Sequence, residues 1–162
     1  MRFIFIDRIV ELEPDRRIRA VKAIGQMDGY LNAHYPRRPI APATLVIEAL
    51  AQAGGWLNLI SRDFGVKVVL GLVEGARIFR PVLPGDVLTL EVELLRGHPD
   101  GATVRGEARV GDELVASVER IVYIHAVEKD ERFRERQREY ARYINGGRAL
   151  ADWAIGGGEA SR

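Results

Sequence analysis

Hydrophobic and polar residues alternate along the second half of the chain, a pattern typical of β-strands that bury one face. From Leu88 to Leu94, every second residue is Leu or Val, and the residues between them are Thr or Glu. Residues 102–110 repeat this alternation, and a further apolar run covers 114–124. Turn signals separate the runs at residues 84–86, 98–101 and 111–112. The sequence therefore predicts an antiparallel meander, with β structure beginning near Lys67.

The N-terminal part predicts two more strands and an irregular connection. Residues 3–12 and 16–25 are rich in Ile and Val and flank a turn signal at 13–15, which is the pattern of a hairpin. Residues 26–42 lose this periodicity and contain three prolines, which we expect to exclude a helix and hold the chain extended. We interpret the prolines as a rigid lead-in to the next element; their spacing also fits a polyproline ligand.

A long apolar helix is predicted from Ala43 to about Arg62. It is apolar on almost every side, which is typical of a buried helix, and at 1.5 Å per residue it spans about 30 Å. Gly54 and Gly55 lie within it, where we expect a neighbouring backbone to approach closely. One such helix with one antiparallel sheet predicts an α+β fold in which the sheet wraps around the helix.

The chain beyond residue 126 is strongly charged. Residues 128–142 contain strong helix formers and few apolar side chains, which predicts a solvated or docking helix. Three glycines at 156–158 and the polar end after them predict disorder. We therefore expect one domain over residues 1–126 and a charged helical tail over 127–162.

The composition restricts the partners and the location. With 24 basic and 23 acidic residues the net charge is +1, so the overall charge favours neither a nucleic acid nor a membrane as partner. Cysteine is absent, which excludes disulfides and thiolate chemistry. The first residues lack the apolar length of a signal peptide, and Glu48 interrupts the longest apolar region, which disfavours a membrane span. A cytoplasmic location is the expectation.

The motifs of several enzyme classes are missing. No serine lies in a Gly-x-Ser-x-Gly motif, and no glycine motif for phosphates or dinucleotides is present. The histidines, at 34, 98 and 125, lack the spacing of metal ligands, so we expect no metal site. We expect His98, in a turn, and His125, at the end of the last strand, to be structural. Acid–base chemistry and binding remain as functions.

Glu48 is the best candidate for an acid. It is the only acidic residue in the apolar helix, and Gln52 lies one turn later on the same face. A carboxylic acid among apolar side chains holds its proton to higher pH, which suits proton donation to a leaving group. The alternative is a structural carboxylate that pairs with an Arg or accepts a hydrogen bond from Gln52.

His34 and the start of the helix complete a set of groups for proton transfer. Imidazole is the commonest general base, although a single loop histidine is also common as a surface or turn residue. The unpaired backbone N–H groups near Ala43 and Thr44 can polarise a carbonyl group and stabilise an enolate. A base, an acid and an oxyanion site around one helix suit removal of a proton next to a carbonyl.

The segment from His34 to Gln52 reads His-Tyr-Pro-x-x-Pro-Ile-x-Pro-x-x-Leu-x-x-Glu-Ala-x-Ala-Gln. It resembles the active-site stretch of the hot-dog-fold 3-hydroxyacyl-[acyl carrier protein] dehydratases, in the FabZ-like branch. The resemblance covers approximately residues 3–124. Further blocks follow in the family's order at residues 5–9, 76–77, 80–86 and 90–92.

The resemblance implies a curved antiparallel sheet around the helix, in a homodimer or a trimer of dimers. Each active site would combine His34 of one subunit with Glu48 of the other. His34 would remove the C2 proton of a 3-hydroxyacyl thioester, and Glu48 would assist departure of the 3-hydroxyl group. The Ala43 backbone N–H and Gln52 would bind the substrate, which is carried on the phosphopantetheine of an acyl carrier protein or of CoA. No further cofactor is implied, and the pathway would be fatty-acid or related acyl-chain biosynthesis.

The chain departs from the family pattern at several positions. Ala43 and Ala33 stand where the family has glycine, the usual Pro-His-Arg lead-in is missing, and the charged tail is additional. Two alternatives therefore stay open: a hot-dog acyl-CoA thioesterase, and a non-catalytic acyl-binding or assembly subunit. The candidates for contact with an acidic carrier protein or a phosphate are Arg37, Arg38, Arg77 and Arg80.

Overall fold

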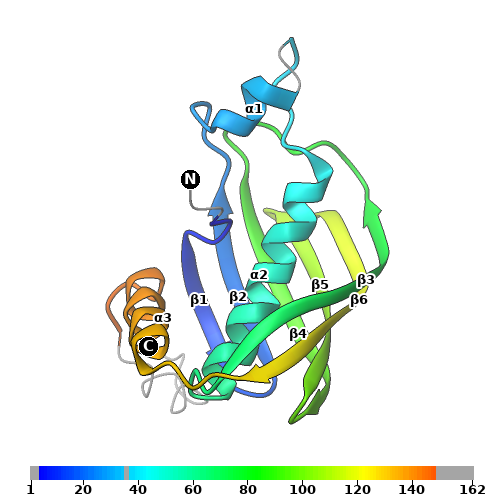
Figure 1. Cartoon of the computed structure of the whole chain (residues 1–162). Coiled ribbons are helices and arrows are strands. Elements are labelled where there is room, and N and C mark those ends of the chain that lie inside the picture. Colours follow the sequence, from blue (N-terminus) through cyan, green and yellow to red (C-terminus); the bar gives the residue numbers. More distant parts are fainter. Residues whose placement is uncertain (1–3, 35–36, 149–162) are drawn as a thin grey trace, which may run out of the picture.

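The computed structural model describes residues 4–34 and 37–148. In chain order its elements are β1 (Arg8–Glu13), β2 (Arg17–Ala23), α1 (Gly29–His34), α2 (Ala43–Ser61), β3 (Val66–Ile78), β4 (Val87–His98), β5 (Gly101–Val110), β6 (Glu113–Val127) and α3 (Glu131–Ile144). The six strands form one antiparallel sheet that curves around α2 (Figure 1). The α+β class expected from the sequence is confirmed.

The order of strands in the sheet is β1-β2-β4-β5-β6-β3. The hairpin β1–β2, predicted from its Ile and Val content around a turn signal, and the meander β4–β5–β6, predicted from alternation, are both present. β3 is placed differently, because it pairs with β6 at the far edge and not with β4, the next strand in the chain. One edge of the sheet is therefore the 13-residue strand β3.

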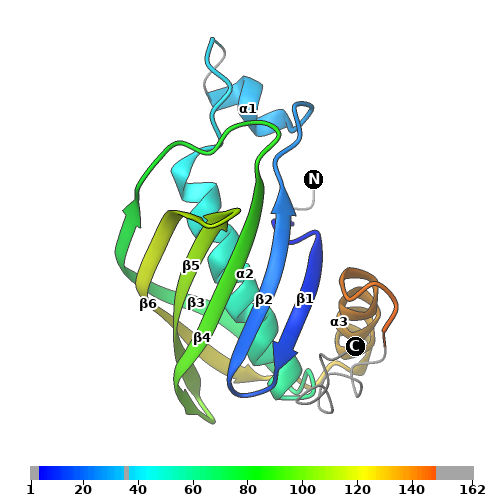
Figure 2. The same cartoon turned by 180° about the vertical axis from the view of Figure 1, so that it is seen from behind.

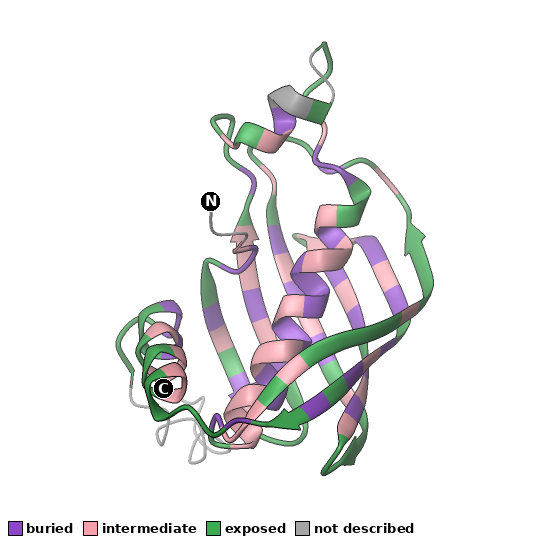
Figure 3. Cartoon of the chain, viewed as in Figure 1, coloured by how far each residue is buried: buried purple, intermediate pink, exposed green. Residues whose placement is uncertain are grey.

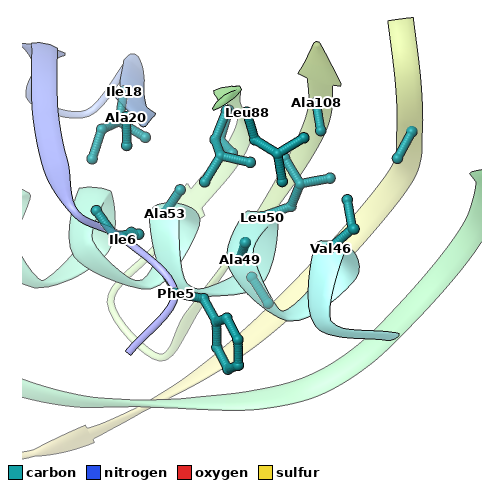
Figure 4. Close-up of a cluster of buried hydrophobic side chains, with 14 of the residues drawn as sticks. Phe5, Ile6, Ile18, Ala20, Val46, Ala49, Leu50, Ala53, Leu88 and Ala108 are labelled. Carbon is teal, nitrogen blue, oxygen red and sulfur yellow. The ribbon is translucent and has the colours of Figure 1, made fainter. Parts of the chain in front are cut away.

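The core lies between α2 and the concave face of the sheet. Val46 and Leu50 of α2 are buried together with Leu88 and Ala108 of the sheet, and Ile6 packs against them from the N-terminal segment (Figure 4). The buried residues of α2 recur at intervals of three and four, so they share one face of the helix. Burial of this face against the sheet is the main apolar contact that holds the two layers together.

The convex face of the sheet is polar over β2, β4 and β5. Figure 2 shows this face, which no described helix covers. Arg19 pairs with Glu91 at 2.8 Å, and Arg105 pairs with Glu93 at 2.6 Å, both across neighbouring strands. An antiparallel sheet with one apolar and one solvated face explains the strict alternation along its strands.

Helix α2 is less buried than its composition predicted. Eight of its 19 residues are buried, and the face that carries Glu48, Gln52 and Gly55 is only partly covered (Figure 3). By length and composition alone α2 could cross a membrane, but its buried face is the one that the sheet wraps. Only the apolar residues on the face of α2 that points to the sheet therefore belong fully to the core; those on the opposite face are partly exposed.

Two local expectations were wrong. A six-residue helix, α1, forms at Gly29–His34, because the prolines follow it and a proline disrupts only a helix that contains it. Asp28 begins this helix: its carbonyl accepts the N–H of Leu31 at 3.0 Å. The second correction concerns Gly54, which faces the side chain of Tyr123 and not a neighbouring backbone.

Helix α3 packs against the end of α2, near β1 (Figure 1). The carboxylate of Asp130 accepts the N–H of Arg132 at 3.0 Å and so caps its N-terminus. Ala141 and Ile144 are buried, and Arg138 pairs with Asp63 at 3.2 Å. The glycines at 156–158 and the end expected to be disordered lie outside the described residues.

Candidate active site

A cavity of about 560 Å³ runs along the partly covered face of α2. Its volume lies within the range of small-molecule sites. The residues of α2 that line it are Glu48, Ala51, Gln52, Gly55, Trp56 and Leu59. They recur at helical intervals, so the cavity follows one stripe of α2 from Glu48 towards its C-terminal end. Val68 and Leu70 of β3 form part of the opposite wall.

Glu48 is held at the cavity by Gln52. The Gln52 Nε2 atom donates a hydrogen bond to Glu48 Oε1 at 2.8 Å, and Gln52 Oε1 accepts the backbone N–H of Phe5 at 2.8 Å. Gln52 therefore fixes the orientation of the carboxyl group relative to the N-terminal segment. The hydrogen bond expected in the structural alternative is present, and the carboxyl group also faces a cavity that can hold a ligand.

Tyr123 of β6 lies beside the same cavity. Its hydroxyl donates a hydrogen bond to the Ala51 carbonyl at 2.6 Å. Burial raises the pKa of Tyr123, and the nearby charge of Glu48 adds to this effect. The hydroxyl therefore stays protonated and serves as a fixed polar contact on α2. Tyr123 was not among the residues that the sequence indicated. The related sequence signal was Gly54, which marks a place where another group comes close to α2, and in the structure that group is the Tyr123 side chain.

His34 lies in a different place from Glu48 within one chain. It is the last residue of α1, its side chain is exposed, and it is not among the described residues that line the Glu48 cavity. Figure 1 shows α1 beyond the N-terminal end of α2. The two candidates for proton transfer therefore do not share a cavity within a single chain.

Ala43 is the first residue of α2, directly after the N-cap residue Pro42. It lies five residues before Glu48, which is about 7.5 Å along the helix axis. Ala43 lines a second cavity of about 310 Å³ that includes Phe79 and Val82 but not Glu48. Pro42 makes no side-chain hydrogen bond to this end of α2, and its carbonyl accepts the N–H of Leu45 at 2.9 Å.

The arginines proposed for carrier contact fall into two groups. Arg77 pairs with Glu119 at 2.9 Å, and Arg80 pairs with both Asp86 and Glu113. These carboxylates already partly neutralise the positive charges of Arg77 and Arg80. The side chains of the other two, Arg37 and Arg38, are exposed.

The other two histidines lie outside the cavity. His98 is exposed at the end of β4, and His125 is buried with Nε2 at 3.2 Å from Asn58 Oδ1 and Nδ1 at 3.2 Å from the Pro99 carbonyl oxygen. Burial lowers the pKa of His125, against the opposing effect of the Pro99 carbonyl. Within residues 4–34 and 37–148, no group of three His, Asp or Glu side chains is arranged to hold a metal ion.

Helix α3 also contributes to the cavity. Arg136, Gln137 and Tyr140 line it, and the Tyr140 ring packs on Trp56 with the ring centroids 5.6 Å apart. The sequence predicted a solvated or docking helix here, without indicating what it would contact. Tyr140 is one of the few apolar residues in this segment. Its contact with Trp56 could not be predicted, because it depends on where α3 packs relative to α2.

Comparisons with known proteins identify the family of this chain. The chain matches the family model of the FabA-like domain over residues 1–119. A 3-hydroxyacyl-[acyl-carrier-protein] dehydratase FabZ from Symbiobacterium thermophilum is 46% identical over 115 residues, covering 70% of this chain and 81% of that protein. A second FabZ, from Variovorax paradoxus, is 39% identical over 116 residues, covering 69% of this chain and 77% of that protein.

A solved structure supports the same architecture. The dehydratase heterocomplex ApeI:P from Xenorhabdus doucetiae aligns with a TM-score of 0.63 at 18% identity, covering 82% of this chain and 89% of that chain. At this identity the likeness concerns the fold alone, and it confirms the hot-dog arrangement of one long helix in a curved sheet.

Proposed function

We propose that this chain, which belongs to the FabA-like family, is a 3-hydroxyacyl thioester dehydratase that produces a trans-2-enoyl thioester and water. The observation that carries this proposal is the position of Glu48. In a segment that matches the FabZ enzymes, Glu48 lies at a cavity whose other walls are largely apolar, as an acyl chain requires. The reaction belongs to fatty-acid or related acyl-chain biosynthesis.

The residues suggest a division of roles. His34 takes the proton from C2, and the electron pair of that C–H bond forms the C2–C3 double bond. The C3–O bond breaks at the same time, and Glu48 gives a proton to the leaving hydroxyl, which departs as water. The backbone N–H of Ala43 polarises the thioester carbonyl and stabilises the negative charge that develops on its oxygen. No cofactor takes part beyond the phosphopantetheine that carries the substrate.

The separation of His34 and Glu48 within one chain supports an active site shared by two subunits. A homodimer would join the sheets at β3, the edge strand, whose backbone offers unpaired hydrogen-bonding groups. Val69, Leu70 and Leu72 of this strand are between 44% and 52% exposed, which is a large apolar surface for an isolated chain. A two-fold axis at this edge would bring two copies of α2 onto the same side of a continuous sheet.

The substrate is proposed to arrive on an acyl carrier protein, as the names of the curated relatives indicate for those enzymes. Arg37 and Arg38 are the exposed positive charges closest in sequence to His34 and suit an acidic partner. The cytoplasm is the proposed location. The curated relatives do not favour the thioesterase or the non-catalytic alternative.

Mixing two inactive variants tests both the reaction and the shared site. His34→Ala and Glu48→Gln should each be inactive with 3-hydroxyacyl thioesters. After the subunits are exchanged, half of the dimers are mixed and each mixed dimer holds one intact site, so about a quarter of the wild-type activity should return. Free thiol measured in the same reactions should stay at background, since only a thioesterase releases it.

The matched control replaces the Glu48→Gln subunit by one that carries both substitutions. Mixing it with His34→Ala subunits supplies no intact histidine, so no activity should return. If light scattering shows dimers and mass spectrometry shows that subunits have exchanged, yet activity does not recover in the first mixture, the shared site is wrong. Full activity in either single variant would refute the role assigned to that residue.

A further inference from the structure

Helix α3 lies outside the part of the chain that matches the family but faces its candidate active site. The family match ends at residue 119, whereas α3 spans Glu131–Ile144. Arg136, Gln137 and Tyr140 line the same cavity as Glu48. These positions are separated by one, three and four residues and therefore share one face of the helix. An addition to the common domain thus forms one wall of the cavity.

Several contacts hold α3 at this place. The Arg138 guanidinium bonds both the carboxylate of Asp63, at 3.2 Å, and its carbonyl, at 3.3 Å. Lys67 lies over the ring of Phe133 at 5.4 Å, and Ile144 is 1% exposed in the core. Helix α3 is capped at its N-terminus and buried at its C-terminus. It is therefore a fixed part of the fold that forms one side of the cavity.

Tyr140 meets α2 at a defined distance from the carboxyl group of Glu48. The ring contact between Tyr140 and Trp56 lies eight residues after Glu48, which is about 12 Å along the helix axis. Between them, Gly55 leaves the cavity open, because a Cβ atom at this position would meet nothing within 4 Å. Along α2 the cavity therefore begins at the Glu48–Gln52 pair, passes the Tyr140–Trp56 pair and reaches Leu59.

We propose that α3 determines which acyl chains this site accepts, with Tyr140 as the side chain that limits their length. This inference rests on the proposed function, since it assigns the acyl part of the substrate to the space between Glu48 and Tyr140. A chain that reaches towards Leu59 has to pass the Tyr140–Trp56 pair or lie against Arg136 and Gln137, which are polar. Short and medium chains fit without this cost.

An acyl chain fits this space better than a second copy of the chain. The cavity has one carboxyl group, that of Glu48, and largely apolar walls beyond it, which suits a substrate with a polar group near its thioester and an apolar chain after it. The exposed apolar residues suited to contact between copies lie instead on β3, with Leu72 and Val69 outside the cavity lining. The dimer edge and the acyl space are therefore neighbouring surfaces that meet at Leu70.

The experiment compares chain-length selectivity in wild type and three variants. The substrates are 3-hydroxybutyryl, 3-hydroxyoctanoyl and 3-hydroxypalmitoyl thioesters. Tyr140→Ala should raise the ratio of kcat/KM for the longest over the shortest chain by about tenfold or more, since each methylene admitted to an apolar pocket is worth at least that. Gly55→Leu, which fills the same space from α2, should lower this ratio. Glu135→Ala changes an exposed side chain of α3 that does not line the cavity, and it should leave the ratio unchanged.

A binding measurement separates this inference from the proposed reaction. Saturated acyl-CoAs of the same three lengths are titrated by calorimetry, and Tyr140→Ala should strengthen binding of the longest one selectively. If this occurs without any dehydration, the reaction is wrong and the role of α3 stands. If dehydration is normal but neither Tyr140→Ala nor Gly55→Leu changes the length preference, α3 does not set it. A change of oligomeric mass on light scattering with unchanged selectivity would assign the cavity to a second copy and overturn the inference.

Discussion

Two adjacent glycines in α2 should respond in opposite directions to the same substitution. At Gly55 a methyl group would meet nothing within 4 Å. Alanine there keeps the helix and removes the conformational cost of glycine, so Gly55→Ala should raise the free energy of unfolding by about 0.5–1 kcal/mol.

At Gly54 the same methyl group would collide with its neighbours. It would lie 3.1 Å from both Tyr123 Cζ and Val104 Cγ2, and closer still to the Tyr123 hydroxyl. Overpacking of this kind costs about 1–3 kcal/mol. Displacement of the ring would also weaken the hydrogen bond to Ala51, worth about 0.5–1.5 kcal/mol. After the gain in helix propensity of about 1 kcal/mol, Gly54→Ala should still lower the stability by about 1–3 kcal/mol.

Urea unfolding followed by circular dichroism measures both effects. The two proteins should differ by about 2–4 kcal/mol with the same dependence on urea concentration. Protein concentrations must be equal, since dimerisation contributes to apparent stability. In the background of Tyr123→Phe, Gly54→Ala should cost less, because the hydroxyl is the atom nearest the new methyl group. Equal shifts of the same sign for both glycines would refute this account of how α2 meets β6.

The remaining predictions concern catalysis and pH. Replacing Glu48 by Gln or His34 by Ala should lower turnover by about 10²–10⁴-fold while thermal unfolding changes little; an unfolded variant would point to a structural role. Gln52→Leu removes both the donor to Glu48 and the acceptor for the N-terminal segment. It should lower kcat by up to about 10²-fold with a smaller change in KM; a change confined to KM would exclude positioning. Because burial lowers the pKa of His125, the unfolded chain binds this proton more readily, so its contribution to stability is complete above about pH 6.5 and is lost as the pH falls. NMR titration of the His125 ring should give a pKa below this value, and a higher one would contradict the assignment.

The amino-acid sequence by itself determined the two layers and the segment that carries the chemistry. Alternation over residues 87–94 and the apolar helix from Ala43 are local patterns, and the structure contains both elements. Each pattern marks one apolar face, and that face is the one that the element buries. The proximity of Glu48 and Gln52 was also readable, since four residues make one helical turn. The family resemblance rested on this segment, from His34 to Gln52, together with the further blocks at residues 5–9, 76–77, 80–86 and 90–92.

Only the tertiary structure decided what surrounds that segment. Three features join parts of the chain that are distant in sequence. They are the edge position of β3, the hydrogen bond from the Phe5 N–H to Gln52, and the contact of Tyr140 with Trp56. Local patterns state which face of an element is apolar, but many partners can cover an apolar face. The choice among them follows from the packing of the whole chain. For this reason the sequence identified Glu48 as a candidate, but it did not show that α3 would line the same cavity.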